Sequence, residues 1–91
     1  MGSVSARKLS HVLDNVWTSL AIEVLSASFG LDQRTPLRPA RAVDGCLNVV
    51  RGVVAPMQGD RPLHRDIDAV LGLLRCGMLT HSAEKVVGAL L

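Results

Sequence analysis

Arg61 and Asp66 have residue types and a spacing that could bind a substrate with a carboxylate group. They flank the start of an expected helix, and the planar guanidinium of an arginine can bind a carboxylate group through two hydrogen bonds. Such a pair could clamp a carboxylate substrate. The more common role is structural, with the arginine holding the loop and the aspartate capping or charging the first helical turn. We expect the structural role for both residues.

Glu23 is the second candidate, because it falls on an apolar helix face beside Val12 and Val16. A carboxylate buried among apolar side chains can serve as a general base. The alternative is an ion pair or a capping contact with a neighbouring chain. We expect the structural alternative here too, and we predict no catalytic residue in this chain.

The histidines and cysteines do not form a recognisable metal site. His11, His64 and His81 are far apart, and neither a His-Glu-x-x-His nor a Cys-x-x-Cys arrangement occurs. Cys46 and Cys76 each lie in an apolar helical context, which favours buried, reduced thiols in a cytoplasmic protein and leaves a disulfide as the alternative. We therefore expect no metal.

The charges argue against nucleic acid and against membranes as partners. The net charge is only +2, which is weak for either. A basic stretch surrounds the second expected helix, but no aromatic residue lies within it for base stacking. No apolar run approaches the roughly 20 residues that span a bilayer. The members of the basic stretch are Arg34, Arg38, Arg41 and Arg51.

The elements that position these residues are expected to be helices only. Hydrophobic residues make up 48% of the 91 residues, with one Trp, one Phe and no Tyr, as in packed helices. Apolar periodicity predicts one long helix over residues 3–29, a second from Pro39 up to Pro56, a third over 65–76 and a short last one over 82–90. We expect an all-α fold in which residues 1–91 form a single helical segment without a second domain.

Glycines and apolar stripes define these helices further. Gly30 suits the left-handed position after the first helix, and Gly77 suits the end of the third. The second helix should bury Val43, Leu47, Val50 and Val54, and the third Ile67, Val70, Leu71 and Leu74. Glycines within helices suggest close helix–helix approach.

The first helix has more apolar surface than so short a chain can cover. One stripe runs along its whole length, and the opposite face becomes apolar in the second half, as in a helix inside a large bundle. A chain of this size is marginal alone. We expect Ile22, Leu25 and Phe29 to form an interface, together with structural roles for Glu23, Arg61 and Asp66. The stripe comprises Leu9, Leu13, Val16, Leu20, Val24 and Ala27.

A series of short motifs resembles the C-terminal end of the aromatic amino acid ammonia-lyase and aminomutase family, nearest to its histidine and tyrosine branches. None is specific alone, but they follow one another in the family's order and at about its spacing over nearly the whole chain. The motifs are Met1-Gly2, Ala6-Arg7-Lys8-Leu9, Asp14-Asn15, Ala21-Ile22-Glu23, Gly30-Leu31-Asp32, Asp60-Arg61-Pro62-Leu63 and Asp66-Ile67-Asp68.

This resemblance implies a helical bundle, usually tetrameric, with active sites shared between subunits. It also implies a methylidene-imidazolone electrophile, formed from an internal Ala-Ser-Gly, that lets ammonia leave an α-amino acid. The chain departs from the family's pattern, because it lacks Ala-Ser-Gly and tyrosine. The family's substrate-contacting Gln-Glu segment would precede Met1. The electrophile is therefore expected in a partner chain.

Three interpretations follow. The chain is the C-terminal fragment or small subunit of such a lyase or aminomutase, inactive alone, with a larger ammonia-lyase-like chain as its partner. Alternatively, it is a non-catalytic helical interaction or oligomerisation module that descends from the family. The third interpretation is a truncated gene product without function. We expect a cytoplasmic location in each case.

Overall fold

The computed structural model describes residues 2–34, 36–56 and 61–88. These residues form four α-helices and no strand. The helices are α1 (Gly2–Gln33), α2 (Arg41–Arg51), α3 (His64–Arg75) and α4 (Met78–Val87). The all-α prediction is confirmed, including one helix much longer than the rest.

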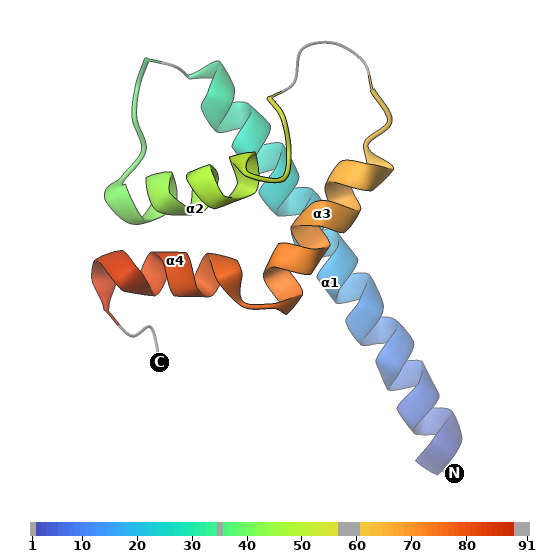
Figure 1. Ribbon diagram of the computed structural model, residues 1–91. Coiled ribbons are helices and arrows are strands. Elements are labelled where there is room, and N and C mark those ends of the chain that lie inside the picture. The colour runs from blue at the N-terminus through green and yellow to red at the C-terminus, as the bar shows by residue number, and fades with distance from the viewer. Residues whose placement is uncertain (1, 35, 57–60, 89–91) are drawn as a thin grey trace.

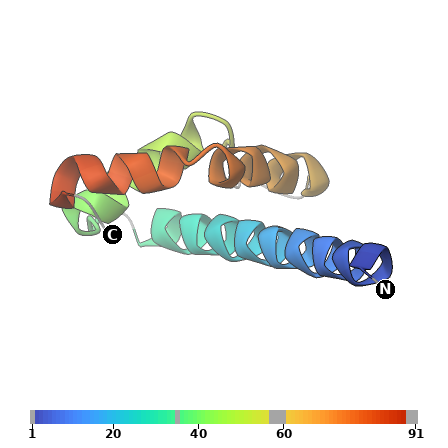
Figure 2. The same cartoon turned by 90° about the horizontal axis from the view of Figure 1, so that it is seen from below.

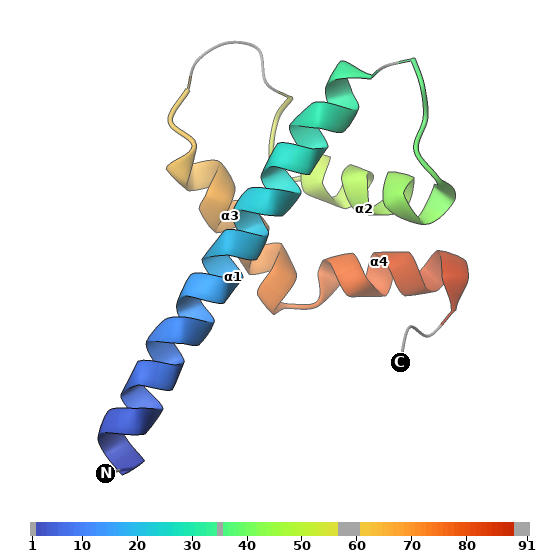
Figure 3. The same cartoon turned by 180° about the vertical axis from the view of Figure 1, so that it is seen from behind.

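The helices pack as two pairs, of which α1 and α3 cross each other while α2 and α4 lie side by side (Figures 1 and 3). α1 packs chiefly against α3, and α2 packs chiefly against α4 (Figure 1). α3 and α4 follow one another on the same side of α1 (Figure 2). The N-terminal half of α1 extends beyond the other three helices, as the views from the front and from behind both show (Figures 1 and 3). Most of this half is therefore exposed within the described chain, although Asp14 and Trp17 near its end contact Arg75 of α3.

A small apolar core lies where α1 crosses α3 and meets the end of α2. Each of its members is at most 9% exposed, and the apolar surface that they remove from water stabilises the described chain. It involves only the C-terminal half of α1. The members are Ala21, Leu25, Val50, Val54, Val70 and Leu73.

The prediction that Gly30 ends the first helix in a left-handed conformation is wrong. α1 continues through Gly30 to Gln33, and the described glycines with positive φ are Gly77 and Gly88. Leu31, half-buried, faces α2 residues across a shared cavity, and Asp32 pairs with Arg51 at the end of α2. These tertiary contacts favour continued helix over the local preference of a glycine.

The second helix is shorter than predicted. It begins at Arg41, after Ala40 in the N-cap position, and ends at Arg51 before Pro56 is reached. Leu47, Val50 and Val54 are buried as expected, whereas Val43 is 46% exposed. Val43 is exposed because it borders an open groove between α1 and α2 rather than a packed helix.

The end of the third helix is confirmed at Gly77, whose φ of 77° is left-handed. The predicted stripe of α3 is slightly rotated, since Leu73 is buried with Val70 while its other members are only partly buried. α4 begins directly after Gly77 at Met78, four residues before the predicted start. Cys76 and the left-handed Gly77 are thus the whole connection between α3 and α4. The predicted helical residues 89 and 90 lie outside the described residues.

Candidate functional site

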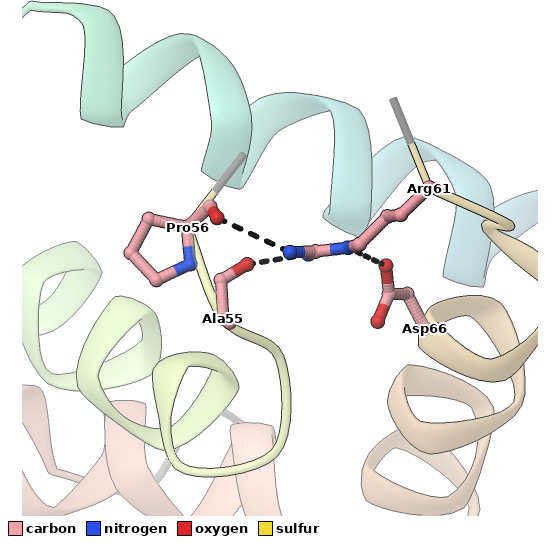
Figure 4. A network of polar contacts seen from close by, with 4 residues as sticks. All are labelled: Ala55, Pro56, Arg61 and Asp66. Atoms are coloured by element: carbon pink, nitrogen blue, oxygen red, sulfur yellow. Dashed lines mark hydrogen bonds and ion pairs between the residues drawn. The ribbon is translucent and has the colours of Figure 1, made fainter. Parts of the chain in front are cut away.

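Arg61 forms a polar node that ties the segment after α2 to the first turn of α3. Its Nε donates to Oδ2 of Asp66 at 2.9 Å, and its two terminal nitrogens donate to the carbonyl oxygens of Ala55 at 2.5 Å and Pro56 at 3.2 Å (Figure 4). The guanidinium carbon also lies 5.9 Å from the centre of the Phe29 ring. Every nitrogen of the guanidinium therefore has an internal partner.

This geometry suits a structural role better than a substrate clamp. A clamp needs a free guanidinium fork, whereas here the fork is occupied by two carbonyl groups and a carboxylate. Asp66 lies in the first turn of α3, where no side chain caps the helix, so its charge also faces the positive end of the helix dipole. The contacts of Arg61 thus hold the segment after α2 against the first turn of α3.

Glu23 is exposed on α1, as are Val12 and Val16 beside it. A general base of the buried kind requires apolar surroundings that exclude water. The described part of the chain does not place such surroundings around Glu23. Its carboxylate is available for a contact with another chain.

The three apolar residues expected at an interface are placed in different environments. Leu25 is 3% exposed and packs into the core of the chain itself. Phe29 is half-buried below the Arg61 guanidinium. Ile22 is 45% exposed and remains open for a partner.

Both cysteines are free thiols, but the expectation that they are buried is wrong for Cys76, which is exposed. Cys46 is partly buried, and its Sγ donates to the carbonyl oxygen of Leu79 at 3.5 Å. Among the residues that the structure describes, no group of three or more His, Cys, Asp or Glu side chains is arranged to hold a metal ion.

An open apolar groove lies between α1, α2 and α4 and encloses about 400 Å³. Its polar members are few, and the hydroxyl of Ser28 is already committed to the carbonyl oxygen of Val24 at 2.8 Å. The groove thus offers apolar surface and little hydrogen-bonding chemistry, which suits packing rather than catalysis. The residues around it are Val24, Ala27, Ser28, Leu31, Val43, Cys46, Leu47, Val50, Leu74, Leu79, Thr80 and Ala83.

The projecting half of α1 carries a second apolar surface. Seven large apolar side chains between residues 4 and 22 are 41% to 58% exposed. Leu9, Leu13, Val16 and Leu20 share one stripe of the helix, and contiguous apolar surface of this kind marks an interaction site. The residues are Val4, Leu9, Val12, Leu13, Val16, Leu20 and Ile22.

The residues of this chain do not fit the electrophile that the resemblance implies. The nearest string, Ala27-Ser28-Phe29-Gly30, lies within α1. Ser28 is 7% exposed, and its hydroxyl bonds the backbone one helical turn earlier. Cyclisation requires a glycine directly after the serine and a backbone that is free to close, whereas here Phe29 follows and the backbone is helical. The chain also has no tyrosine.

The described residues form a small all-helical segment with two uncovered apolar surfaces. The chain is 49% identical over 90 residues to the histidine ammonia-lyase of Sorangium cellulosum (strain So ce56), covering 99% of the chain and 18% of that enzyme. It is 47% identical over 79 residues to the histidine ammonia-lyase of Anaeromyxobacter sp. (strain K), covering 87% of the chain and 16% of that enzyme. It is 41% identical over 90 residues to the histidine ammonia-lyase of Symbiobacterium thermophilum (strain DSM 24528 / JCM 14929 / IAM 14863 / T), covering 99% of the chain and 18% of that enzyme.

The chain belongs to the ammonia-lyase family and corresponds to a C-terminal segment of these enzymes. It spans less than a fifth of their length. No family model and no solved structure matches it. No helix within the described ranges combines the length and the apolar character that crossing a bilayer requires.

Proposed function

We propose that this chain is the C-terminal part of a methylidene-imidazolone-dependent aromatic amino acid ammonia-lyase or aminomutase, acting as a small subunit or fragment of it. In this role it completes the helical bundle and a subunit interface, and it is inactive without a chain that carries the catalytic residues. One observation carries the proposal. The chain aligns over 99% of its length with only 18% of a histidine ammonia-lyase, and most of the N-terminal half of its longest helix is uncovered (Figure 1).

The physical reason is the free energy of exposed apolar surface. Each square ångström of apolar surface removed from water stabilises an assembly by about 25 cal/mol. The open groove and the projecting half of α1 both offer such surface. In the relatives, more than four fifths of the enzyme lies outside the matched segment. We infer that a larger ammonia-lyase-like chain packs into the groove between α1, α2 and α4.

The contribution of this chain to the reaction is then positional. The methylidene-imidazolone electrophile and the groups that move protons belong to the larger chain. The residues described here hold helices in place, with the Arg61 node fastening α2 to α3. A cytoplasmic location belongs to the same proposal, since the two free cysteines suit a reducing compartment.

The test is isolation of the tagged full chain from its native source, followed by intact mass measurement and an assay for ammonia release from histidine, tyrosine and phenylalanine. We expect a larger chain containing Ala-Ser-Gly to co-purify, and only the complex to release ammonia. Ammonia release by the purified chain alone would overturn the proposal. Recovery of the chain without a larger partner would also contradict it.

Two valines of similar exposure provide a matched pair of variants. Val43 is 46% exposed and borders the groove, while Val53 is 49% exposed and does not. Val43→Asp should abolish recovery of the larger chain, because a carboxylate in an apolar interface loses its hydration. Val53→Asp should leave recovery unchanged.

The second candidate function is a non-catalytic oligomerisation module that descends from the same family. The exposed apolar face of α1 favours it, since this face could bind another copy of the chain. A stable homo-oligomer that binds no larger chain and releases no ammonia would support this alternative.

A further inference from the structure

A small cavity of mixed charge lies between the end of α1, the segment before α2 and α2 itself. It encloses about 150 Å³, and its lining includes the polar residues Arg38, Asp44 and Asn48. The larger groove between α1, α2 and α4 shares Leu31 and Leu47 with this cavity but none of these three polar residues. The cavity therefore offers the hydrogen-bonding groups that the groove lacks.

One face of α2 supplies most of the polar lining. Asp44, Asn48 and Arg51 follow one another at intervals of four and three residues, which places them on the same side of the helix. Arg38 belongs to the segment that precedes α2, so it reaches the cavity from a different part of the chain. A carboxylate, an amide and two guanidinium groups are thus gathered around one space.

Two of these charges are not neutralised within the chain. Arg51 forms an ion pair with Asp32 at the end of α1. Arg38 and Asp44 differ from it, because none of the ion pairs or side-chain hydrogen bonds of the described residues involves either of them. Their opposite charges line the same small cavity without pairing with each other. Space for a ligand therefore remains between them.

A capping role does not account for Asp44. Its charge suits the positive end of the α2 dipole, but no side chain caps this helix through a hydrogen bond. Asp44 is also partly buried. A partly buried carboxylate without a partner has lost hydration that a bound cation can replace.

The two opposite charges favour a ligand that carries both signs. A simple anion is attracted by Arg38 and repelled by Asp44, and a simple cation meets the reverse. An α-amino acid carries a carboxylate next to an ammonium group, so it satisfies both residues at once. A guanidinium binds a carboxylate through two parallel hydrogen bonds, and an ammonium group donates to a carboxylate.

The volume of the cavity limits the size of the amino acid. Pockets for drug-sized ligands enclose about 300–1,000 Å³, whereas this cavity encloses about 150 Å³. Leu31 and Leu47 provide an apolar wall for a short side chain. Glycine, alanine and serine are of suitable size, whereas an aromatic ring needs more room.

We propose that this cavity binds a small zwitterionic α-amino acid, with its carboxylate on Arg38 and its ammonium group on Asp44. The amide of Asn48 can donate to the carboxylate or accept from the ammonium group. A bound amino acid then bridges α2 and the segment before it. The inference rests on the charges and the volume of the cavity, and it depends neither on the family match nor on a larger chain.

A nuclear magnetic resonance titration of the ¹⁵N-labelled full chain with L-alanine tests the site. We expect saturable shifts of the backbone amide signals of Asp44, Leu47 and Asn48, whereas the signal of Ala83 in the larger groove should not move. Acetate and methylammonium should each bind about 10-fold more weakly or worse, because each meets only one of the two charges. L-Phenylalanine should also bind more weakly, because of its size.

Two results of this titration would contradict the proposal. The absence of saturable shifts with L-alanine would overturn the site itself. Acetate binding as tightly as L-alanine would overturn the recognition of both charges. Neither result bears on the proposed function, which fails instead if no larger chain co-purifies.

Matched variants test which residues bind the ligand. Asp44→Asn and Arg38→Gln should each weaken the binding of L-alanine about 10-fold or more, because each removes a hydrogen bond to a charged group. Asp68→Asn and Arg65→Gln are the controls, since these exposed residues of α3 lie outside the cavity and the substitutions change the net charge equally. Unchanged affinity in Asp44→Asn and Arg38→Gln would overturn the proposal, provided that circular dichroism shows the same helix content for all four variants.

Discussion

The Nε atom of Arg61 donates a 2.9 Å hydrogen bond to the carboxylate of Asp66, and this contact fastens the segment after α2 to the start of α3. The same guanidinium binds the carbonyl oxygens of Ala55 and Pro56 (Figure 4). Hydrogen bonds to charged groups contribute more to stability than neutral ones do. The stability of the chain should therefore depend on Arg61 in a way that can be measured.

Arg61→Ala should lower the free energy of unfolding by about 1–3 kcal/mol, because Asp66 and two backbone carbonyl groups lose their shared donor. The measurement is urea unfolding followed by circular dichroism at a fixed protein concentration. Arg65→Ala is the control, since Arg65 is an exposed residue at the start of α3 and should change stability by less than about 0.5 kcal/mol. Equal effects of the two variants would contradict the fastening role.

Arg61→Lys distinguishes a fastening from a substrate clamp. Lysine keeps the positive charge but cannot reach three acceptors with a planar fork, so most of the stability loss should remain. A clamp predicts the opposite pattern, in which stability is unchanged and only the KM of an active complex rises. Unfolding curves and steady-state kinetics of the complex separate the two.

Gly45→Ala tests the contact between α2 and α4. A Cβ atom at residue 45 would lie 3.2 Å from Oγ of Ser82, whereas a Cβ at Gly72 would meet nothing within 4 Å. Gly72→Ala should stabilise the chain by about 0.5–1 kcal/mol through helix propensity. Gly45→Ala should gain less or lose stability. Adding Ser82→Ala should restore the gain at residue 45, because it removes the crowding atom, and thermal unfolding of the three variants checks this.

The sequence predicted the helices well where local preferences and packing agree. Gly77 is left-handed and follows the end of α3 as predicted, because the chain changes direction there between α3 and α4 (Figure 1). Gly30 has the same local preference, but helix continues through it because Leu31 and Asp32 interact with α2. Such contacts between distant segments leave no signal in a local pattern.

The candidate site was only partly predictable, for a similar reason. The excess apolar surface of α1 was evident from residue types alone, and the structure shows where that surface lies. Periodicity could not show that Leu25 packs into the core of the chain while Ile22 stays open, because this depends on where α3 crosses α1. The open groove was not predicted, since Val43 has the periodicity of a buried residue.

Gly77→Ala should destabilise the chain by about 1 kcal/mol, because a side chain at a φ of 77° is strained. Gly77→Asn should lose less, since asparagine tolerates the left-handed region better. No atom lies within 4 Å of a Cβ added there, so the effect reports backbone strain rather than crowding. Equal stability of the alanine and asparagine variants, measured by urea unfolding, would contradict this explanation.

Arg75→Ala tests the contact where α3 ends against α1. The guanidinium donates to Oδ1 of Asp14 at 3.1 Å and lies 5.8 Å from the centre of the Trp17 ring. Both ion-pair side chains are at least half exposed, so the pair should contribute less than about 1 kcal/mol and weaken in salt. The cation–π contact adds about 0.5–1 kcal/mol and is less sensitive to salt because it involves no second charge.

These two contributions can be separated because Trp17 is the only tryptophan. Asp14→Asn should remove the salt dependence of unfolding and leave the tryptophan fluorescence nearly unchanged. Arg75→Ala should remove the salt dependence and also change the fluorescence, since the cation leaves the indole ring. A double-mutant cycle with both substitutions then gives the coupling energy of the ion pair. A fluorescence change in Asp14→Asn as large as that in Arg75→Ala would mean that the ion pair, rather than the ring contact, orients Arg75 at the base of the projecting half of α1.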